Sequence, residues 1–307
     1  MINRGLLETT TERRSFFYGP VIQAGLEAAA GAKKPTRLIF GTGSVMIIVP
    51  SRTEAKKMKT KSLNDQMNEL LVDNGASLVG FADLRGLYCD ADVTKLPRSE
   101  DSQTEPFDVP RYENGVAIAV AIPPEIVRGI KNAPTMAYYD AYHALNDKLD
   151  ALANLCAEHL RKSGYNAYPQ TVSATKEYGV FRTIMPHKTV ALHAGLGWIG
   201  KSALFVTERF GSAIRLTSVL TDAPLDCAAR VIQPKCGGCT ICADACPAGA
   251  ISGALWSAGK DREDFFHAMD CRLKAREIAA KTLDKKITLC GKCIEVCPYT
   301  QRYLNKA

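Results

Sequence analysis

The chain has 307 residues, a length that suggests two domains and leaves ample material for a hydrophobic core. Its hydrophobic content of 46% and charged content of 23% are ordinary for a globular protein. No apolar run approaches the roughly 20 residues that a membrane span requires. The net charge is +7, but residues 1–57 hold nine Lys/Arg and four Asp/Glu, which leaves only +2 for the remainder. A strongly basic face for nucleic acid is therefore not evident in the body of the protein.

Residues 1–57 differ in pattern from the rest of the chain. Arg13-Arg14, followed by Ser-Phe-Phe, resembles a twin-arginine export motif, but polar residues interrupt the apolar segment that should follow it. Met58 is an alternative start, and we favour it. We therefore expect residues 1–57 to be an unstructured or mis-assigned N-terminal extension, and the protein to be cytoplasmic. Export is the alternative if the arginine pair is a real signal.

From residue 58 the pattern becomes regular. Apolar residues recur at helical spacing from Leu63 up to Asn74-Gly75, which ends the helix, and residues 78–82 favour a strand. Residues 115–122 form a continuous apolar run between Asn-Gly and Pro-Pro, which predicts a strand buried on both faces.

The next elements continue this alternation of helices and strands. We predict a long helix at 135–163, closed by Gly164, a strand near 165–172, a short helix at 187–193, a glycine-bearing turn at 194–200 and a strand at 211–221. Cys156 falls on the apolar side of the long helix and is expected to pack there as a small hydrophobe. The alternation predicts an α/β or α+β layered domain over residues 58–228.

The last seventy residues carry two cysteine motifs. The first reads C-x2-C-x2-C-x3-C-P and contains Cys236, Cys239, Cys242 and Cys246, which is the spacing by which bacterial ferredoxins hold a [4Fe–4S] cluster. The second has a C-x2-C-x3-C-P tail, and an upstream cysteine supplies its fourth thiol. Its members are Cys271, Cys290, Cys293 and Cys297. We predict a ferredoxin-like domain with two [4Fe–4S] clusters over residues 229–307.

The predicted ligation is crossed, because in two-cluster proteins the fourth cysteine of one motif ligates the other cluster. One cluster takes Cys236, Cys239, Cys242 and Cys297, and the other takes Cys246, Cys271, Cys290 and Cys293. Paired zinc sites are the alternative for C-x2-C knuckles, but the cysteine triplet and the two C-P endings are not zinc spacing. A disulfide framework is less favoured because a chain of this size needs no staples.

A family resemblance begins at residues 194–201, which read Ala-Gly-Leu-Gly-Trp-Ile-Gly-Lys. Together with Gly211-Ser212, the Thr-Asp-Ala-Pro-Leu stretch at 221–225 and the cysteine block, this order resembles the epoxyqueuosine reductase family, which is related to reductive dehalogenases. The chain resembles a short form that lacks the C-terminal helical repeats. The resemblance implies a nitroreductase/reductive-dehalogenase-like domain that carries cobalamin. It also implies an iron–sulfur, cobalamin-dependent reductase fed by an external donor of ferredoxin or flavodoxin type.

The resemblance also suggests site residues. It implies that residues of the glycine-bearing turn contact cobalamin, although spacing alone fits a tight turn that caps a helix equally well. These residues are Gly195, Gly197, Trp198 and Lys201. Family enzymes carry a proton-donating Asp before this turn, whereas residues 171–178 here contain none, so Glu177 and Tyr178 are weak candidates for the acid.

Two departures from the family pattern bear on the substrate. His187-Lys188 stands where the family often has Asp-Arg, and the sequence stops at Ala307 without the repeats that help to hold tRNA. With the small charge after residue 57, this makes tRNA a doubtful substrate. We weigh two functions: an iron–sulfur reductase acting on an unidentified electrophile, and an electron-transfer protein that serves a partner such as a corrinoid protein.

Overall fold

The computed structural model describes residues 61–88, 110–131, 133–174, 183, 185–229 and 231–306. It also describes the backbone of two short antiparallel strands, β1 (Leu38–Phe40) and β2 (Gly43–Val45). Lys61–Ala307 form one compact unit and Met1–Thr60 another. Arg13-Arg14 lie outside the described residues, so both readings of the N-terminal stretch stay predictions.

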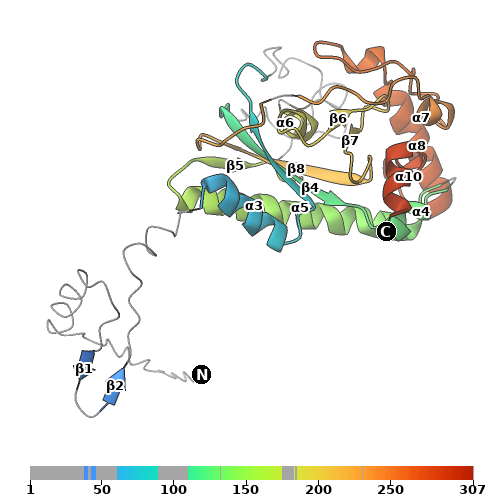
Figure 1. The fold of residues 1–307 in the computed structure, drawn as a ribbon. Helices are drawn as coiled ribbons and strands as arrows, with labels where there is room; N and C mark the ends of the chain where they lie inside the picture. Colours follow the sequence, from blue (N-terminus) through green and yellow to red (C-terminus); the bar gives the residue numbers. More distant parts are fainter. Residues whose placement is uncertain are drawn as a thin grey trace, which may run out of the picture. The chain divides into compact units, whose positions relative to one another are not determined.

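The centre of the larger unit is a four-stranded antiparallel sheet in the order β3-β4-β8-β5 (Figure 1). Its strands are β3 (Leu78–Asp83), β4 (Asn114–Ala121), β5 (Ala167–Pro169) and β8 (Ile214–Thr221). The strand predicted near 165–172 is shorter than expected. The last backbone–backbone hydrogen bond to β8 is donated by the Gln170 backbone N–H to the Ser218 carbonyl, and the chain then enters a turn. A mixed α/β fold is confirmed, with antiparallel pairing throughout this sheet.

Helices cover both faces of β4, which confirms the prediction that this strand is buried on both sides. Successive side chains of a strand point to opposite faces. Val116 and Ile118 therefore pack with α3 (Leu63–Asp73) and α5 (Met136–Lys162). On the other face, the small side chains of Ala117 and Ala119 pack with α6 (His187–His193). Figure 1 shows α3 and α5 on one side of the sheet and α6 on the other.

Helix α5 begins and ends where its capping residues predict. The Thr135 hydroxyl accepts the Tyr138 backbone N–H at 3.2 Å, satisfying one of the free donors of the first turn. Gly164 follows the C-cap with φ of +92°, a conformation that glycine adopts at little cost. Cys156 is fully buried in the core beneath this helix, as expected, and burial raises the pKa of its thiol.

The cysteine-rich part is mostly helical, and several of its helices contain or directly follow a motif cysteine. Its helical elements are α7 (Ile241–Asp244), a 3-10 turn (Arg262–Asp264), α8 (Ala268–Leu283), α9 (Lys292–Glu295) and α10 (Pro298–Leu304). Between α6 and β8 lies a small hairpin of β6 (Trp198–Ile199) and β7 (Phe205–Val206). Helix α4 (Pro124–Arg128) connects β4 to α5.

The cysteine-rich part packs closely on the layered part. A shared apolar cluster joins Ile122, Ile130 and Tyr138 to Ile294 and Leu304. The two parts thus lie within one compact unit, and the boundary at residue 228 stays a prediction.

Polar contacts fix this packing at the start of β8. A Cβ at Gly211, whose φ is +58°, would lie 2.2 Å from the Thr300 backbone nitrogen. The Ser212 backbone N–H donates to the Thr300 hydroxyl at 3.1 Å. The Tyr303 hydroxyl donates to the Ile122 carbonyl, also at 3.1 Å. In the described part of the chain, no helix is both long and apolar enough to cross a membrane.

Candidate iron–sulfur site

Four thiols form what we call the first thiol set: Cys236, Cys239, Cys242 and Cys297. Burial raises the pKa of Cys242 to about 11, and the next causes, in order, are the charges of Cys297, Cys236 and Cys239. The strongest thiol neighbour of Cys242 therefore comes from the other motif, 55 positions along the chain. Cys297 reaches this place because Pro298 opens α10, which docks on Gly211 and Ser212.

The remaining motif thiols form the second thiol set: Cys246, Cys271, Cys290 and Cys293. Burial raises the pKa of Cys271 to about 11, helped by the charges of Cys246 and Cys290. Burial also raises the pKa of Cys293, with further contributions from Cys271, Cys290, Cys242 and Cys246. Cys246, from the first motif, thus neighbours thiols of the second. Cys293 lies close enough to both sets to be affected by each.

The chemistry of these donors fits two iron–sulfur cubanes. Each described motif cysteine is free of a disulfide and partly buried. The pKa values of Cys242, Cys271 and Cys293 are all raised, because burial and the charges of neighbouring thiolates disfavour ionisation of these thiols. Bound iron would supply the missing positive charge, and soft thiolates suit it. Among the described residues, no group of three or more His, Cys, Asp or Glu side chains is arranged to hold a single metal ion.

The stretch of residues 194–201, here called the glycine turn, joins α6 to the first thiol set. Gly195 has φ of +68°, and its neighbour Leu196 donates a backbone N–H to the Ala191 carbonyl at 3.2 Å, which ends α6 as a C-terminal cap. A Cβ at Gly197 would lie 2.1 Å from the Val206 carbonyl oxygen. Local packing therefore accounts for both glycines.

Trp198 and Lys201 face the cysteine-rich part. Trp198 is fully buried, and its ring meets that of Tyr299 edge-on at 4.8 Å. Lys201 is 5% exposed and donates from Nζ to the Cys239 carbonyl at 2.9 Å. A Cβ at Gly200 would lie 3.7 Å from the Cys236 sulfur. A role for the glycine turn in holding cobalamin stays a prediction. The contacts of Gly200 and Lys201 are with Cys236 and Cys239 of the first thiol set.

His187 and Lys188 lie at the start of α6, on the face of the sheet opposite α3 and α5. His187 Nδ1 lies 2.8 Å from the Ser218 hydroxyl, which also accepts from the Gln170 amide at 2.7 Å. Burial, with a smaller effect of Arg215, lowers the pKa of His187 to about 4. Lys188 donates to the Ala203 carbonyl at 2.7 Å, and burial lowers its pKa to about 8. These contacts tie α6 to its surroundings.

The proposed acids Glu177 and Tyr178 lie outside the described residues, so their role stays a prediction. Two contact residues were missed from the sequence. Tyr299 contacts Trp198, and Thr300 receives Gly211. Both residues directly follow Cys297-Pro298 in the sequence. This position beside a predicted ligand is the one signal by which they could have been found.

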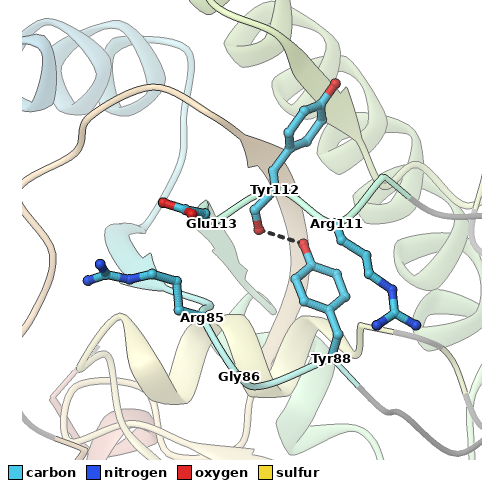
Figure 2. Close-up of a pocket in the computed structure, with 6 residues that line it drawn as sticks. All are labelled: Arg85, Gly86, Tyr88, Arg111, Tyr112 and Glu113. Atoms are coloured by element: carbon cyan, nitrogen blue, oxygen red, sulfur yellow. Dashed lines mark hydrogen bonds between the residues drawn. The ribbon is translucent and has the colours of Figure 1, made fainter.

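One cavity of about 250 Å³ lies apart from the predicted site residues, none of which lines it. Its lining consists of Arg85, Gly86, Tyr88, Arg111, Tyr112 and Glu113. Figure 2 shows the two arginines on opposite sides of Tyr88, whose hydroxyl donates to the Tyr112 carbonyl at 2.7 Å. This volume is below the roughly 300–1,000 Å³ typical of pockets for small-molecule ligands and cofactors.

Comparison with known proteins supports the motif-based resemblance. Residues 235–300 match the family described as "4Fe-4S double cluster binding domain". An epoxyqueuosine reductase of Synechocystis sp. is 30% identical over 165 residues, which cover 53% of this chain and 53% of that protein. A Bacillus cereus epoxyqueuosine reductase is 29% identical over 156 residues, covering 47% of this chain and 37% of the relative. The matches therefore span about half of these relatives or less.

Two solved structures share the fold. A selenomethionine-labelled epoxyqueuosine reductase has a TM-score of 0.50 and 22% identity, covering 78% of this chain and 66% of its own. A reductive dehalogenase, described as suggesting a mechanism for B12-dependent dehalogenation, has a TM-score of 0.56 and 18% identity. That likeness covers 92% of this chain and 36% of the dehalogenase. The predicted resemblance is thus confirmed: the chain is similar in sequence to epoxyqueuosine reductases, shares a fold with them and with reductive dehalogenases, and ends in a 4Fe-4S double cluster binding domain.

Proposed function

We propose that the chain is an iron–sulfur oxidoreductase of the epoxyqueuosine reductase type. The first thiol set would hold one [4Fe–4S] cluster and the second set the other. When bound, such clusters supply one-electron transfer at potentials that the protein tunes through charge, hydrogen bonds and burial. The observation that supports the proposal is electrostatic: the thiol with the largest effect on the pKa of Cys242 is Cys297, and the one with the largest effect on Cys271 is Cys246, each from the other motif.

The protein's own residues would hold the site in place. Gly211 and Thr300 fix α10, and with it Cys297, against the sheet. On the other motif, a Cβ at Gly291 would lie 2.8 Å from the Tyr138 ring, so this loop packs tightly on α5. Both thiol sets are thus packed against elements of the layered part, which would limit the rearrangement that accompanies a change of charge.

We infer that the electron acceptor is a corrinoid, because the dehalogenase of similar fold is described as B12-dependent and the motifs resemble a cobalamin-using family. The residues proposed to touch it do not line a described cavity: Gly197 and Trp198 are packed inside, and Lys201 bonds to Cys239. These three residues are therefore not arranged to receive a corrinoid. The substrate that the resemblance implies is an epoxide on a modified tRNA base, and the low charge after residue 57 counts against it.

The same contacts favour a second candidate. If the glycine turn serves only to connect α6 with the first thiol set, the chain is an electron-transfer protein that delivers electrons to a partner. The direct bond from Lys201 to the Cys239 carbonyl is the observation that supports this reading.

A titration separates the two. Anaerobically purified protein is analysed for iron, sulfide and cobalt and then titrated with cob(II)alamin, with free Co²⁺ as the control for binding to thiols. Saturable binding of about one corrinoid per chain, with about eight irons present, supports the reductase. Clusters without corrinoid binding support the electron-transfer protein, and a chain that holds zinc in place of iron contradicts both.

A further inference from the structure

Lys201 places a buried positive charge beside the first thiol set. Its side chain comes from the end of the glycine turn, the residue is 5% exposed, and Nζ donates to the Cys239 carbonyl at 2.9 Å. Gly200, the preceding residue, approaches the Cys236 sulfur. Within the described ranges, no carboxylate forms an ion pair with Lys201. Its charge is therefore not offset by a neighbouring acid.

A lysine within the second motif, by contrast, is paired with a carboxylate. Lys292 lies between Cys290 and Cys293 in the sequence, and its ammonium donates to Glu295 at 2.8 Å and to the Lys131 carbonyl at 2.7 Å. Glu295 is itself largely covered, at 20% exposure, so the pair is close to neutral as seen from the cluster. Lys235, beside Cys236, is also paired, with Glu208.

A buried, uncompensated positive charge favours the more negative of two redox states. Reduction adds one negative charge to a cluster, and a cation in a low-dielectric environment stabilises that charge more strongly than a solvated or paired cation does. The bond to the Cys239 carbonyl holds the ammonium in place and counters the negative end of a peptide dipole in the cluster loop.

We propose that Lys201 is a positioning residue that raises the midpoint potential of the cluster held by the first thiol set above that of the cluster held by the second set. This inference rests on the proposed function. It gives the two sites unequal potentials, with the higher one beside the glycine turn.

The test is an anaerobic redox titration of the two cluster signals by electron paramagnetic resonance. Lys201→Gln removes the charge and keeps a donor for the Cys239 carbonyl, while Lys201→Arg keeps both. Lys292→Gln/Glu295→Gln is the matched control, since it removes both members of a paired lysine and carboxylate and leaves the net charge unchanged. Cys271→Ala, which removes a thiol of the second set, identifies the signal that belongs to the first.

We expect Lys201→Gln to lower the ratio of reduced to oxidised first cluster about tenfold at a fixed potential, equivalent to about 59 mV for a one-electron couple. We expect Lys201→Arg to retain the wild-type value and Lys292→Gln/Glu295→Gln, which keeps the net charge, to shift neither cluster by a comparable amount. An unchanged first-cluster potential in Lys201→Gln overturns the inference.

A wild-type measurement keeps the inference testable if Lys201→Gln fails to assemble. The first cluster must then have the higher potential in the unmodified protein, and the reverse order overturns the inference. Iron and sulfide analysis of the same samples separates failure of the Lys201 inference from failure of the proposed function. A wild-type chain without clusters contradicts the proposed function itself.

Discussion

At the scale of single residues, two side chains show how position decides the role of a common residue type. Gly197 resembles a residue that lets a cofactor approach the backbone. The space that a Cβ at this position would need is instead taken by the Val206 carbonyl oxygen. His187 begins the dipeptide that stands where the family often has Asp-Arg, yet its ring is hydrogen-bonded to Ser218 and its pKa is lowered to about 4. Both therefore contribute first to the stability of the fold.

Gly197→Ala should destabilise the protein even in the absence of any cofactor. A Cβ 2.1 Å from a backbone oxygen forces β6 and β7 apart, and overpacking of this kind typically costs about 1–3 kcal/mol. Urea denaturation followed by circular dichroism measures the loss. Gly238→Ala is the control, because no atom lies within 4 Å of the Cβ added there. Equal stability of the two variants would show that Gly197 does not serve packing.

His187 should make the fold less stable in mild acid. The folded pKa of about 4 lies below the usual 6.5, so the unfolded chain takes up the proton first as the pH falls. The stability from the neutral ring is complete above about pH 6.5 and is lost progressively towards pH 4. Melting temperatures at pH 7, 6 and 5 should fall more steeply for the wild type than for His187→Gln, which cannot titrate. Parallel curves would contradict this assignment.

At the scale of elements, the contact between the start of β8 and α10 determines where Cys297 lies. Gly211 has a positive φ, and Thr300 occupies the space that a side chain at Gly211 would need. The two residues are 89 positions apart, and the Thr300 hydroxyl accepts the Ser212 backbone N–H. A motif cysteine is thus positioned by a strand of the central sheet.

Gly211→Ala should therefore affect both stability and cluster content. Strain at positive φ costs roughly 1–2 kcal/mol, and the clash with the Thr300 backbone adds about 1–3 kcal/mol. Gly253→Ala is the matched control, because its φ is +85° and nothing lies within 4 Å of the added Cβ. We expect Gly211→Ala to lose more unfolding free energy than the control and to retain less iron. Equal losses would show that the α10 contact is unimportant.

The sequence predicted the elements whose signals are local. The long helix predicted at 135–163 and closed by Gly164 is α5, the helix at 187–193 has its predicted limits, and the apolar run at 115–122 is the buried strand β4. Long-range pairings were not predicted: β8 lies between β4 and β5, and an alternation of helices and strands along the chain does not reveal that order. For the same reason, the contact of Lys201 with Cys239 could not be predicted, since spacing shows neither which face a side chain takes nor what meets it there.

At the scale of the whole molecule, the account depends on two thiol sets that each draw from both motifs. Crossed ligation would link the loop that holds Cys236, Cys239 and Cys242 to α10, which packs on Gly211, so cluster assembly and packing of the two parts would depend on each other. It also brings Cys293 close to both sets, as expected for adjacent clusters. Uncrossed ligation would place Cys293 and Cys297 on one cluster.

The iron content of two double variants tests this arrangement most directly. Cys242→Ala/Cys297→Ala removes two thiols of the first set, so we predict that it loses one cluster and keeps about four irons per chain. Cys293→Ala/Cys297→Ala removes one thiol from each set, so we predict that it loses both clusters, from a wild-type content of about eight irons. The reverse result, with both clusters lost in the first variant and one retained in the second, would contradict crossed ligation.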